Sequence, residues 1–466
     1  MRIIVWFRGK DLRVSDHAPL RDAAKAGEMI PLFVLDPYFF SPERGQQLPH
    51  RMQFLLESMT ELESNIARLG SRLIVVPGKS IDVVPKLFRS WNADWVYAHR
   101  WTEPFGRERD QRIHEAINGK LRLYEGETLC PPGRLRAQSG RPYSVFTRFA
   151  QAFEAKEVIN KPLARVRSLP PLPAGIRTRT VPIPSINELG IPLNPNLQKG
   201  GESKARARLR TFIEANLKTY ATRRDRVDLA STSRLSADIK FGTLSIHHVW
   251  NEVTKAPGMR AGKRSFLNEL LWREFAYSTL WDRPQVLERP FQAAFDHFPW
   301  RYDENEWNAW VEGRTGYPIV DASARQLLTE GFVHNRARMI SASFLTKHLL
   351  MDYRRGEAHY LKYLTDGDWA NNNMGWQWSA GCGCDAQPYF RVFNPVTQGQ
   401  KFDPEGNYVR RWVPELKAMP NRFIHEPWKA TQSAVLNQSA GYPRPIVDHV
   451  FARMRFLGIA KAHLSR

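Results

Sequence analysis

The chain has 466 residues and is 42% hydrophobic, which excludes a disordered chain and leaves room for two or three domains. Its net charge of +21 favours a polyanionic partner such as nucleic acid, because the basic residues are spread along the chain rather than gathered in one tail. No apolar run is long enough to span a bilayer, the N-terminus does not read as a signal peptide, and the few cysteines indicate neither a disulfide framework nor a metal site, so we expect a cytoplasmic protein.

The first 130 residues alternate short apolar runs with amphipathic stretches, which predicts a parallel, Rossmann-like α/β sheet. We expect strands at 3–7, 31–35, 73–76, 95–98 and 121–124. Helices are expected between them at 18–26, 51–69, 81–91 and 107–117. No Gly-x-Gly-x-x-Gly follows the first strand, so the ordinary dinucleotide fingerprint is absent.

The remaining chain divides into a connector and a helical part. Residues 131–202 read as a proline-rich connector on the surface, because proline cannot sit inside helices. Residues 203–466 read as an all-α domain, with helices expected at 205–219, 245–253, 265–280, 321–331, 336–352, 358–364 and 442–457.

One segment of the helical part combines residue types that are unusual in a packing helix: Asp366-Gly-Asp-Trp-Ala-Asn-Asn-Asn-Met-Gly-Trp-Gln-Trp378. Asn is a poor helix-interior residue, and a buried Trp needs a partner for its N–H. Helical spacing places Asn372 and Trp376 on one face. The segment therefore predicts a site where a polar amide meets a flat aromatic ligand.

Two other segments carry candidate ligand-binding side chains. Residues 232–236, Thr-Ser-Arg-Leu-Ser, place hydroxyls and an Arg just before a helix, where they could bind a phosphate; a helix cap is the plainer alternative and explains one hydroxyl. Glu269 and Trp272 lie at i and i+3, so a carboxylate and an indole could grip one heteroaromatic ligand. The alternative is a core Trp with Glu at the rim.

A third helix presents an amide beside an adaptable apolar surface. Asn335 and Met339 lie at i and i+4 and therefore share a face. Arg338 has charge partners in Asp366 or Asp368.

Five motifs in this order resemble the photolyase/cryptochrome family, most closely the class I cyclobutane pyrimidine dimer photolyases. They are residues 232–236, 268–275, 334–339, 366–378, and 389–395 with 398–402. Residues 5–8 followed by 11–13 also resemble the start of the family, so the resemblance covers essentially the whole chain.

The resemblance implies an α/β antenna-binding domain, a connector and an all-α C-terminal domain that binds FAD. Asn372 would face flavin N5, and Arg338 would pair with Asp366. The second chromophore stays open between a folate, a deazaflavin, FMN and none. The cofactor-binding residues implied are Tyr220, Thr232, Ser233, Arg234, Leu235, Ser236, Arg338, Asp366, Gly367, Asp368 and Asn372.

The resemblance also implies light-driven repair of dimers in UV-damaged DNA, in which excited reduced FAD gives an electron to a flipped-out dimer. A monomeric, nucleoid-associated enzyme is expected. The catalytic residues implied are Glu269, Trp272, Asn335, Met339, Asn372 and Trp378. Further DNA contacts are implied for Arg273, Arg336, Arg391 and Gln398.

Rival functions within the family differ at a few positions. Met339 stands where six-four photolyases need a His, which favours dimer repair. A DASH-type cryptochrome or a light-sensing, DNA-binding flavoprotein with weak or no duplex repair is the alternative.

The chain departs from the family pattern in the electron relay. Trp376 matches the proximal and Trp300 the distal Trp, but Tyr353 holds the middle position. Since Tyr is harder to oxidise unless it loses a proton, we expect slow photoreduction or a detour through Trp369; simple packing is the alternative for Trp369.

The antenna region departs as well. Glu103 and Glu108 both miss the register of the acidic residue that grips a folate in some relatives, and Leu287 stands where those relatives have a Lys.

Overall fold

The computed structural model describes residues 1–430 and 441–465. It divides into two compact units. Unit 1 comprises residues 1–218 and 233–284, and unit 2 comprises residues 219–232 and 285–466. The division predicted from the sequence, with boundaries at residues 130 and 202, stays a prediction, because each compact unit is made of two separate segments of the chain.

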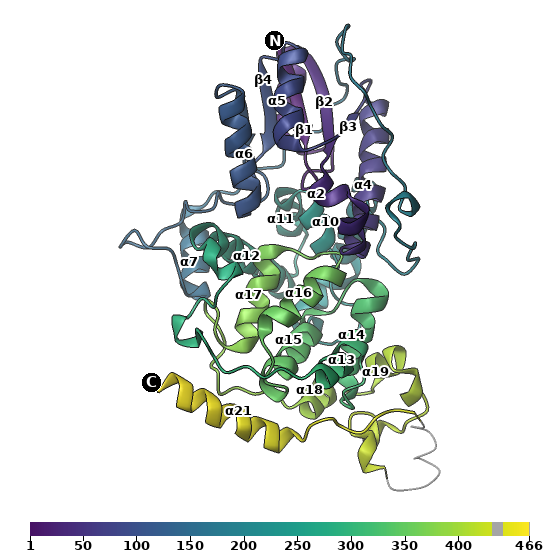
Figure 1. Cartoon of the computed structure of the whole chain (residues 1–466), viewed down its shortest axis with the longest axis vertical. Coiled ribbons are helices and arrows are strands. Elements are labelled where there is room, and N and C mark those ends of the chain that lie inside the picture. Colours follow the sequence, from purple (N-terminus) through teal and green to yellow (C-terminus); the bar gives the residue numbers. More distant parts are fainter. Residues whose placement is uncertain (431–440, 466) are drawn as a thin grey trace. The chain divides into compact units, whose positions relative to one another are not determined.

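Unit 1 contains a parallel five-stranded sheet of order β3-β2-β1-β4-β5 within the fully described first 130 residues (Figure 1). Each predicted strand is present: β1 Arg2–Phe7, β2 Glu28–Leu35, β3 Ile74–Pro77, β4 Trp95–His99 and β5 Leu121–Tyr124. Alternate residues of β1 enter two separate cores, Ile3 and Val5 on one face and Ile4 and Trp6 on the other. Burial on both faces explains why the central strands β1 and β2 are almost continuously apolar, whereas the edge strand β5 carries the exposed Arg122.

Helices cover both faces of the sheet. Leu20 of α1 (Ala18–Ala26) and Met52 of α4 (Pro49–Arg68) share the core of Val5, while Val84 of α5 (Ser80–Ser90) and Ile113 of α6 (Pro104–Ala116) share that of Ile4. The other helices of unit 1 are α2 Pro37–Phe40, α3 Pro42–Gln46, α7 Phe146–Lys156, α8 Glu202–Thr211, α10 Ser236–Phe241, α11 Ile246–Lys255 and α12 Arg260–Asp282.

The predicted connector contains a helix that the sequence analysis missed. Helix α7 lies before the proline-rich stretch, and its buried Phe149 and Phe153 pack in unit 1. The following residues form only one short 3-10 turn, Asn187–Leu189. They are tied to the sheet region by backbone bonds from Leu169 to Leu69 and from Val181 to Val75.

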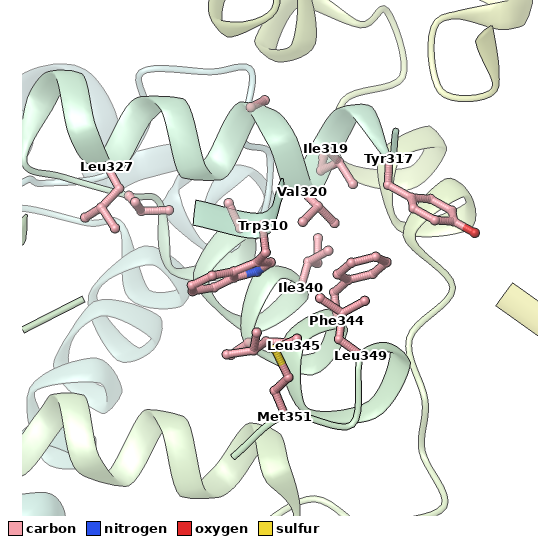
Figure 2. Close-up of a cluster of buried hydrophobic side chains, with 14 of the residues drawn as sticks. Trp310, Tyr317, Ile319, Val320, Leu327, Ile340, Phe344, Leu345, Leu349 and Met351 are labelled. Atoms are coloured by element: carbon pink, nitrogen blue, oxygen red, sulfur yellow. The ribbon is translucent and has the colours of Figure 1, made fainter. Parts of the chain in front are cut away.

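Unit 2 is helical, and its core lies around Trp310, which is 1% exposed (Figure 2). Figure 2 shows Ile340, Phe344 and Leu345 in the same cluster. The helices are α9 Tyr220–Arg223, α13 Glu304–Glu312, α14 Pro318–Glu330, α15 Asn335–Ser343, α16 Tyr353–Tyr363, α17 Trp369–Ala380, α18 Pro395–Phe402, α19 Asn407–Trp412 and α21 His449–Leu464. The short helical turns are Pro284–Leu287, Ala293–Phe295, Pro414–Leu416, Asn421–Phe423 and Pro427–Lys429.

Several helix boundaries differ from expectation: the helix predicted at 265–280 spans Arg260–Asp282, and the one predicted at 358–364 begins at Tyr353. The helix predicted to start at 442 begins at His449, because Pro443 and Pro445 interrupt the pattern. The helices predicted at 205–219 and 336–352 change into π-helical turns at Phe212–Asn216 and Phe344–His348. Among the described residues, no helix is long and apolar enough to cross a membrane.

Candidate functional site

The unusual Asp–Asn–Trp segment forms the start of α17. Asp368, which is 5% exposed, is the N-cap and accepts hydrogen bonds from the backbone N–H and the side-chain amide of Asn371, both at 2.8 Å. The cap explains why Asp and Asn stand together here. Trp369, the candidate for an electron detour, is the first residue of the helix and is half-buried.

The next two Asn residues both bond to Glu357 of α16. Nδ2 of Asn372 donates to the backbone carbonyl of Glu357 at 3.0 Å, which leaves the Asn372 amide oxygen as the acceptor that faces away. Nδ2 of Asn373 donates to the Glu357 carboxylate at 3.1 Å. Burial raises the pKa of Glu357 to about 7. The amide of Asn372 is therefore oriented before any ligand arrives.

Sequence reasoning missed two buried amides that hold this helix in place. Gln377 donates to the carbonyl of Val286 at 2.9 Å and accepts from the N–H of Phe291 at 2.7 Å. Asn373 donates to the same Val286 carbonyl at 3.0 Å. These amides fasten α17 to the chain segment 286–291. Their spacing of four residues is the available sequence signal, because it places both on one buried helix face.

The predicted pairing of Arg338 is confirmed. Its guanidinium donates to both oxygens of Asp366, at 2.9 and 3.2 Å, and to the carbonyl of Val333 at 2.7 Å. The Asp366 side chain is 7% exposed. The pair thus links α15 to the turn before α17, and Gly367 lies buried within that turn.

Helix α15 presents the predicted Asn335 and Met339 together. Nδ2 of Asn335 lies 3.7 Å from Sδ of Met339, as helical spacing predicted. His334 caps the helix through Nδ1, which accepts the N–H of Arg336 at 3.1 Å. The guanidinium of Arg336 bonds to Asp225 at 2.9 Å, so this predicted DNA contact has a partner within the protein.

Helix α12 of unit 1 carries the predicted Glu269 and Trp272, both half-buried. The indole of Trp272 is stacked on the ring of Phe146, with 3.7 Å between centroids and 7° between planes. Arg273 bonds to the buried Glu274 at 3.2 Å and lies over the ring of Tyr277. Burial raises the pKa of Glu274 to about 7.

The predicted phosphate-binding residues lie around two short helices. Tyr220 is buried at the start of α9. Ser236 begins α10, and the Ser233 hydroxyl accepts the N–H of Leu235 at 3.4 Å. Arg234 adopts a left-handed backbone, with φ of 52°. The Ser233 bond lies in the turn before α10, whose N-cap Leu235 has no side-chain cap bond, so a helix cap accounts for none of these hydroxyls. Phosphate binding by Thr232 and the rest of the group stays a prediction.

The ring of Trp376 packs against aromatic residues outside the predicted relay, and the relay itself stays a prediction. The Trp376 ring lies 5.1 Å from that of Tyr360 and 6.1 Å from that of Trp310, and Trp310 lies 5.4 Å from Trp307. Sequence reasoning did not single out Trp307 or Trp310, because their i, i+3 spacing reads as ordinary core packing.

The middle member of the expected relay is poorly suited to oxidation. Tyr353 is 2% exposed, its hydroxyl has no hydrogen-bond partner among the described residues, and burial raises its pKa. A tyrosyl radical needs a group that takes the phenolic proton, and this hydroxyl has none there. Trp300, the predicted distal member, packs on Phe298 at 4.4 Å.

The remaining predicted substrate and DNA contacts lie near the end of α17 or after it. Trp378 is half-buried near the end of this helix. Arg391 is exposed, and its backbone carbonyl accepts a bond of 2.9 Å from the buried Lys347. Gln398 is half-buried in α18.

The carboxyl edge of the sheet is filled by charged and aromatic side chains. The guanidinium of Arg109 lies 4.9 Å from the Trp6 ring and 4.4 Å from the Trp101 ring, and burial lowers its pKa to about 10. Glu103 pairs with Lys10 at 2.9 Å. Because the Glu103 carboxylate is already paired with Lys10, it is poorly suited to bind a folate. Its register in the sequence led to the same expectation.

A buried trio on the same edge, Asp11, His17 and His99, places its potential ligand atoms within 4.8 Å of one another. Nδ1 of His17 accepts the N–H of Leu20 at 3.1 Å, so the proton of the neutral ring sits on Nε2, facing Asp11. Burial lowers the pKa of His99 to about 3, which keeps that ring neutral. The three side chains form a buried polar network around the Asp11 carboxylate.

The residues of unit 2 fit a flavin. The Asn372 oxygen, which bonds to no described residue, can accept from a ring N–H. Asp368 and the Arg338–Asp366 pair supply polar groups at the same helix start. These donors and acceptors suit a heteroaromatic ring carrying both N–H and C=O groups.

Comparisons with known proteins cover the whole chain. The family model for the FAD binding domain of DNA photolyase matches residues 266–462, and the DNA photolyase model matches residues 3–172. Two deoxyribodipyrimidine photo-lyases are similar: that of Agrobacterium fabrum is 38% identical over 98% of this chain and 96% of its own, and one from Thermus thermophilus is 39% identical over 98% of both.

Solved structures are similar over the same extent. A bacterial class III photolyase from Agrobacterium tumefaciens has a TM-score of 0.92 at 36% identity and covers 100% of this chain and 98% of that one. A cryptochrome from Synechocystis has a TM-score of 0.90 at 31% identity, covering 98% and 99%. An archaeal photolyase from Sulfolobus tokodaii, solved with two FAD molecules, has a TM-score of 0.84 at 29% identity and covers 100% of both.

Proposed function

We propose that this chain, which belongs to the photolyase/cryptochrome family, repairs cyclobutane pyrimidine dimers in UV-damaged DNA under blue light. The chain is an FAD-binding enzyme of that family. The observation that carries dimer specificity is Met339 beside Asn335 on α15, an apolar surface next to an amide. A His at position 339 would instead indicate six-four repair.

Each candidate residue has one task in this proposal. Trp272 and Trp378 pack against the damaged bases, and Met339 adds apolar contact. Glu269 and Asn335 hydrogen-bond the pyrimidine edges. Reduced FAD, when bound and excited by light, would lend an electron that opens the dimer ring and then returns to the flavin, so no side chain has to act as a nucleophile.

The polar groups of unit 2 prepare the flavin site. Asn372 would accept the N5–H of the flavin through its amide oxygen, since its Nδ2 is held by Glu357. Arg338 holds Asp366, and Asp368 caps α17 beside them. Tyr220 and residues 232–236 would bind the FAD phosphates.

Repair is tested on a duplex oligonucleotide that carries one thymine dimer. Blue light should remove dimers from this duplex, and the dark sample should keep them. Absence of light-dependent loss, with the flavin fully reduced, would exclude dimer repair. Trp378→Ala should weaken binding to damaged DNA more than to undamaged DNA; equal losses would contradict the pocket role of Trp378.

A cryptochrome-like function is the second candidate, because the Synechocystis cryptochrome has a TM-score of 0.90. A DASH-type protein would repair a dimer in single-stranded DNA better than the same dimer in duplex. A light sensor would change its flavin spectrum in light and leave both dimers intact. Running both substrates side by side separates the three outcomes.

Several finer assignments belong to the same proposal. Class I membership is proposed from the motifs and has a competitor, since the Agrobacterium tumefaciens structure is that of a class III photolyase. We also propose a monomer in the cytoplasm, associated with the nucleoid. Light scattering tests the monomer, and chromophores extracted from fresh protein and identified by mass reveal whether a second one is bound.

A further inference from the structure

Trp272 presents only part of its ring to a ligand, because Phe146 covers one face. The two rings are nearly parallel, at 7°, and their centroids are 3.7 Å apart. Phe146 is 7% exposed, whereas Trp272 is half-buried. Phe146 comes from α7, a helix far from α12 in the sequence. The face opposite Phe146 and the ring edge are what a base could reach.

Phe146 itself is held by further rings. Phe275, one turn along α12, lies 6.0 Å from both Phe146 and Trp272 and meets each ring edge-on. Phe149 packs on Phe275 at 5.3 Å. Phe153, the next α7 ring, lies 5.9 Å from Trp250 of α11. The stacked pair therefore packs directly on Phe275, and Phe149 and Phe153 continue the aromatic layer on the side away from the pair.

The loop before α7 is fastened to the end of α12. Arg136 bonds both oxygens of Asp282, at 2.5 and 2.6 Å. The hydroxyl of Tyr143 donates to the carbonyl of Arg136 at 3.2 Å. Near the other end of the loop, Glu274 of α12 accepts the N–H of Leu129 at 2.8 Å. Helix α12 thus holds the segment that brings Phe146 to Trp272.

We infer that Phe146 is a positioning residue that fixes the plane of the Trp272 indole for stacking on a damaged base. This inference rests on the proposed role of Trp272 in dimer binding. An aromatic ring that is already immobilised loses little freedom on binding, so the gain from base stacking is kept. Because Phe146 is 7% exposed, in this arrangement it would act through Trp272 rather than by contacting DNA itself.

The test measures dissociation constants in the dark for a duplex with one thymine dimer and for the same duplex without damage. The variants are Phe146→Leu, Trp272→Ala, the double variant, and Phe149→Leu as a matched control from the same helix and aromatic layer. Phe146→Leu should weaken dimer binding roughly three- to tenfold, the loss equivalent to freezing one side chain. Binding to undamaged DNA should not change, and Phe149→Leu should leave the ratio of the two constants as in wild type.

Two further readouts separate positioning from general damage to the fold. Phe146→Tyr keeps the ring and should restore the wild-type ratio. In the Trp272→Ala background, Phe146→Leu should have no additional effect, because the Trp272 ring through which Phe146 acts is absent. Phe146→Met is the substitute if the Leu variant does not fold, as judged by circular dichroism.

Each contrary outcome has a distinct meaning. Additive effects in the double variant, or equal losses on both duplexes, would overturn the inference. If Trp272→Ala lowers the ratio and Phe146→Leu does not, the inference is wrong and the proposed function stands. If Trp272→Ala leaves the ratio unchanged, both the DNA role of Trp272 and the positioning role of Phe146 are wrong.

Discussion

Helix α12 of unit 1 and helices α15 and α17 of unit 2 hold their candidate side chains by different means. Trp272 is held by ring packing against Phe146. Asn372 is held by a hydrogen bond and Asp366 by an ion pair. Ring packing depends on shape and responds little to pH or salt, whereas the polar contacts depend on charge and protonation. The two regions should therefore fail under different substitutions and conditions.

The largest expected effect on stability comes from a substitution in the polar region of unit 2. Arg338→Ala removes the only cation that bonds Asp366 among the described contacts and leaves a carboxylate whose side chain is 7% exposed. Breaking a buried pair by removing one partner costs about 3–5 kcal/mol. We expect a loss of this size in urea unfolding, together with reduced flavin content in the purified protein.

The exposed pair Arg314–Glu312 supplies the control. Both side chains are about half exposed, at 53% and 52%, so Arg314→Ala should cost about 0–1 kcal/mol. Similar small losses in both variants would show that the Arg338–Asp366 pair does not hold α15 and α17 together.

The second prediction concerns the pH dependence of the polar region. Burial lowers the pKa of His334 to about 4, below its ordinary value of 6.5. The neutral ring therefore stabilises the fold fully above pH 6.5, and this stabilisation is lost as the pH falls from 6.5 to about 4. His334→Asn keeps a capping side chain without the titration. The stability advantage of wild type should shrink by roughly 2–3 kcal/mol over this range.

Urea unfolding of both proteins from about pH 7.5 to about pH 4 measures the difference, a range that spans the titration of this ring. Other buried histidines titrate in both proteins, so their contributions cancel in the comparison. A difference that stays constant with pH would mean that His334 is not held neutral at the start of α15.

The third prediction concerns electron transfer to the flavin, which depends on ring packing and on whether the oxidised residue has to lose a proton. Tyr353→Trp should speed flavin photoreduction, because Trp can be oxidised without losing a proton. Trp310→Phe should slow it, since the Trp310 ring lies 6.1 Å from that of Trp376. Trp369→Phe tests the detour proposed from the sequence.

Photoreduction is followed by flavin absorbance under blue light with a thiol as the external reductant. Repair by protein whose flavin is already reduced should be unaffected in all variants. Equal photoreduction rates in wild type and the three variants would reject both the detour and the Trp310 branch.

The smallest expected effect concerns DNA charge contacts. If the basic face meets about five phosphates, log K should fall with log salt at a slope of roughly −4 to −5. Arg391→Ala should reduce that slope by about 1 and weaken damaged and undamaged DNA alike. Arg314→Ala removes the same formal charge and should leave the slope unchanged. A flat salt response in wild type would show that the net positive charge does not serve DNA binding.

Local sequence patterns were sufficient for much of the fold. All five predicted strands are present, and in the central strands a nearly continuous apolar run indicates burial on both faces of the sheet. The pairing of Asn335 with Met339 followed from helical spacing alone. Helix α7 was missed, since its neighbourhood is rich in proline and its own apolar stripe is short.

The sequence by itself determined the order of the five strands, the family motifs and the residue types of the candidate site. The tertiary structure decided which neighbours orient them: Phe146 against Trp272, Glu357 beneath Asn372, and Trp310 beside Trp376. Each of these contacts joins segments that are distant in the chain. Local periodicity indicates which face of a helix is buried. The residues that contact this face are determined only when the helices pack together.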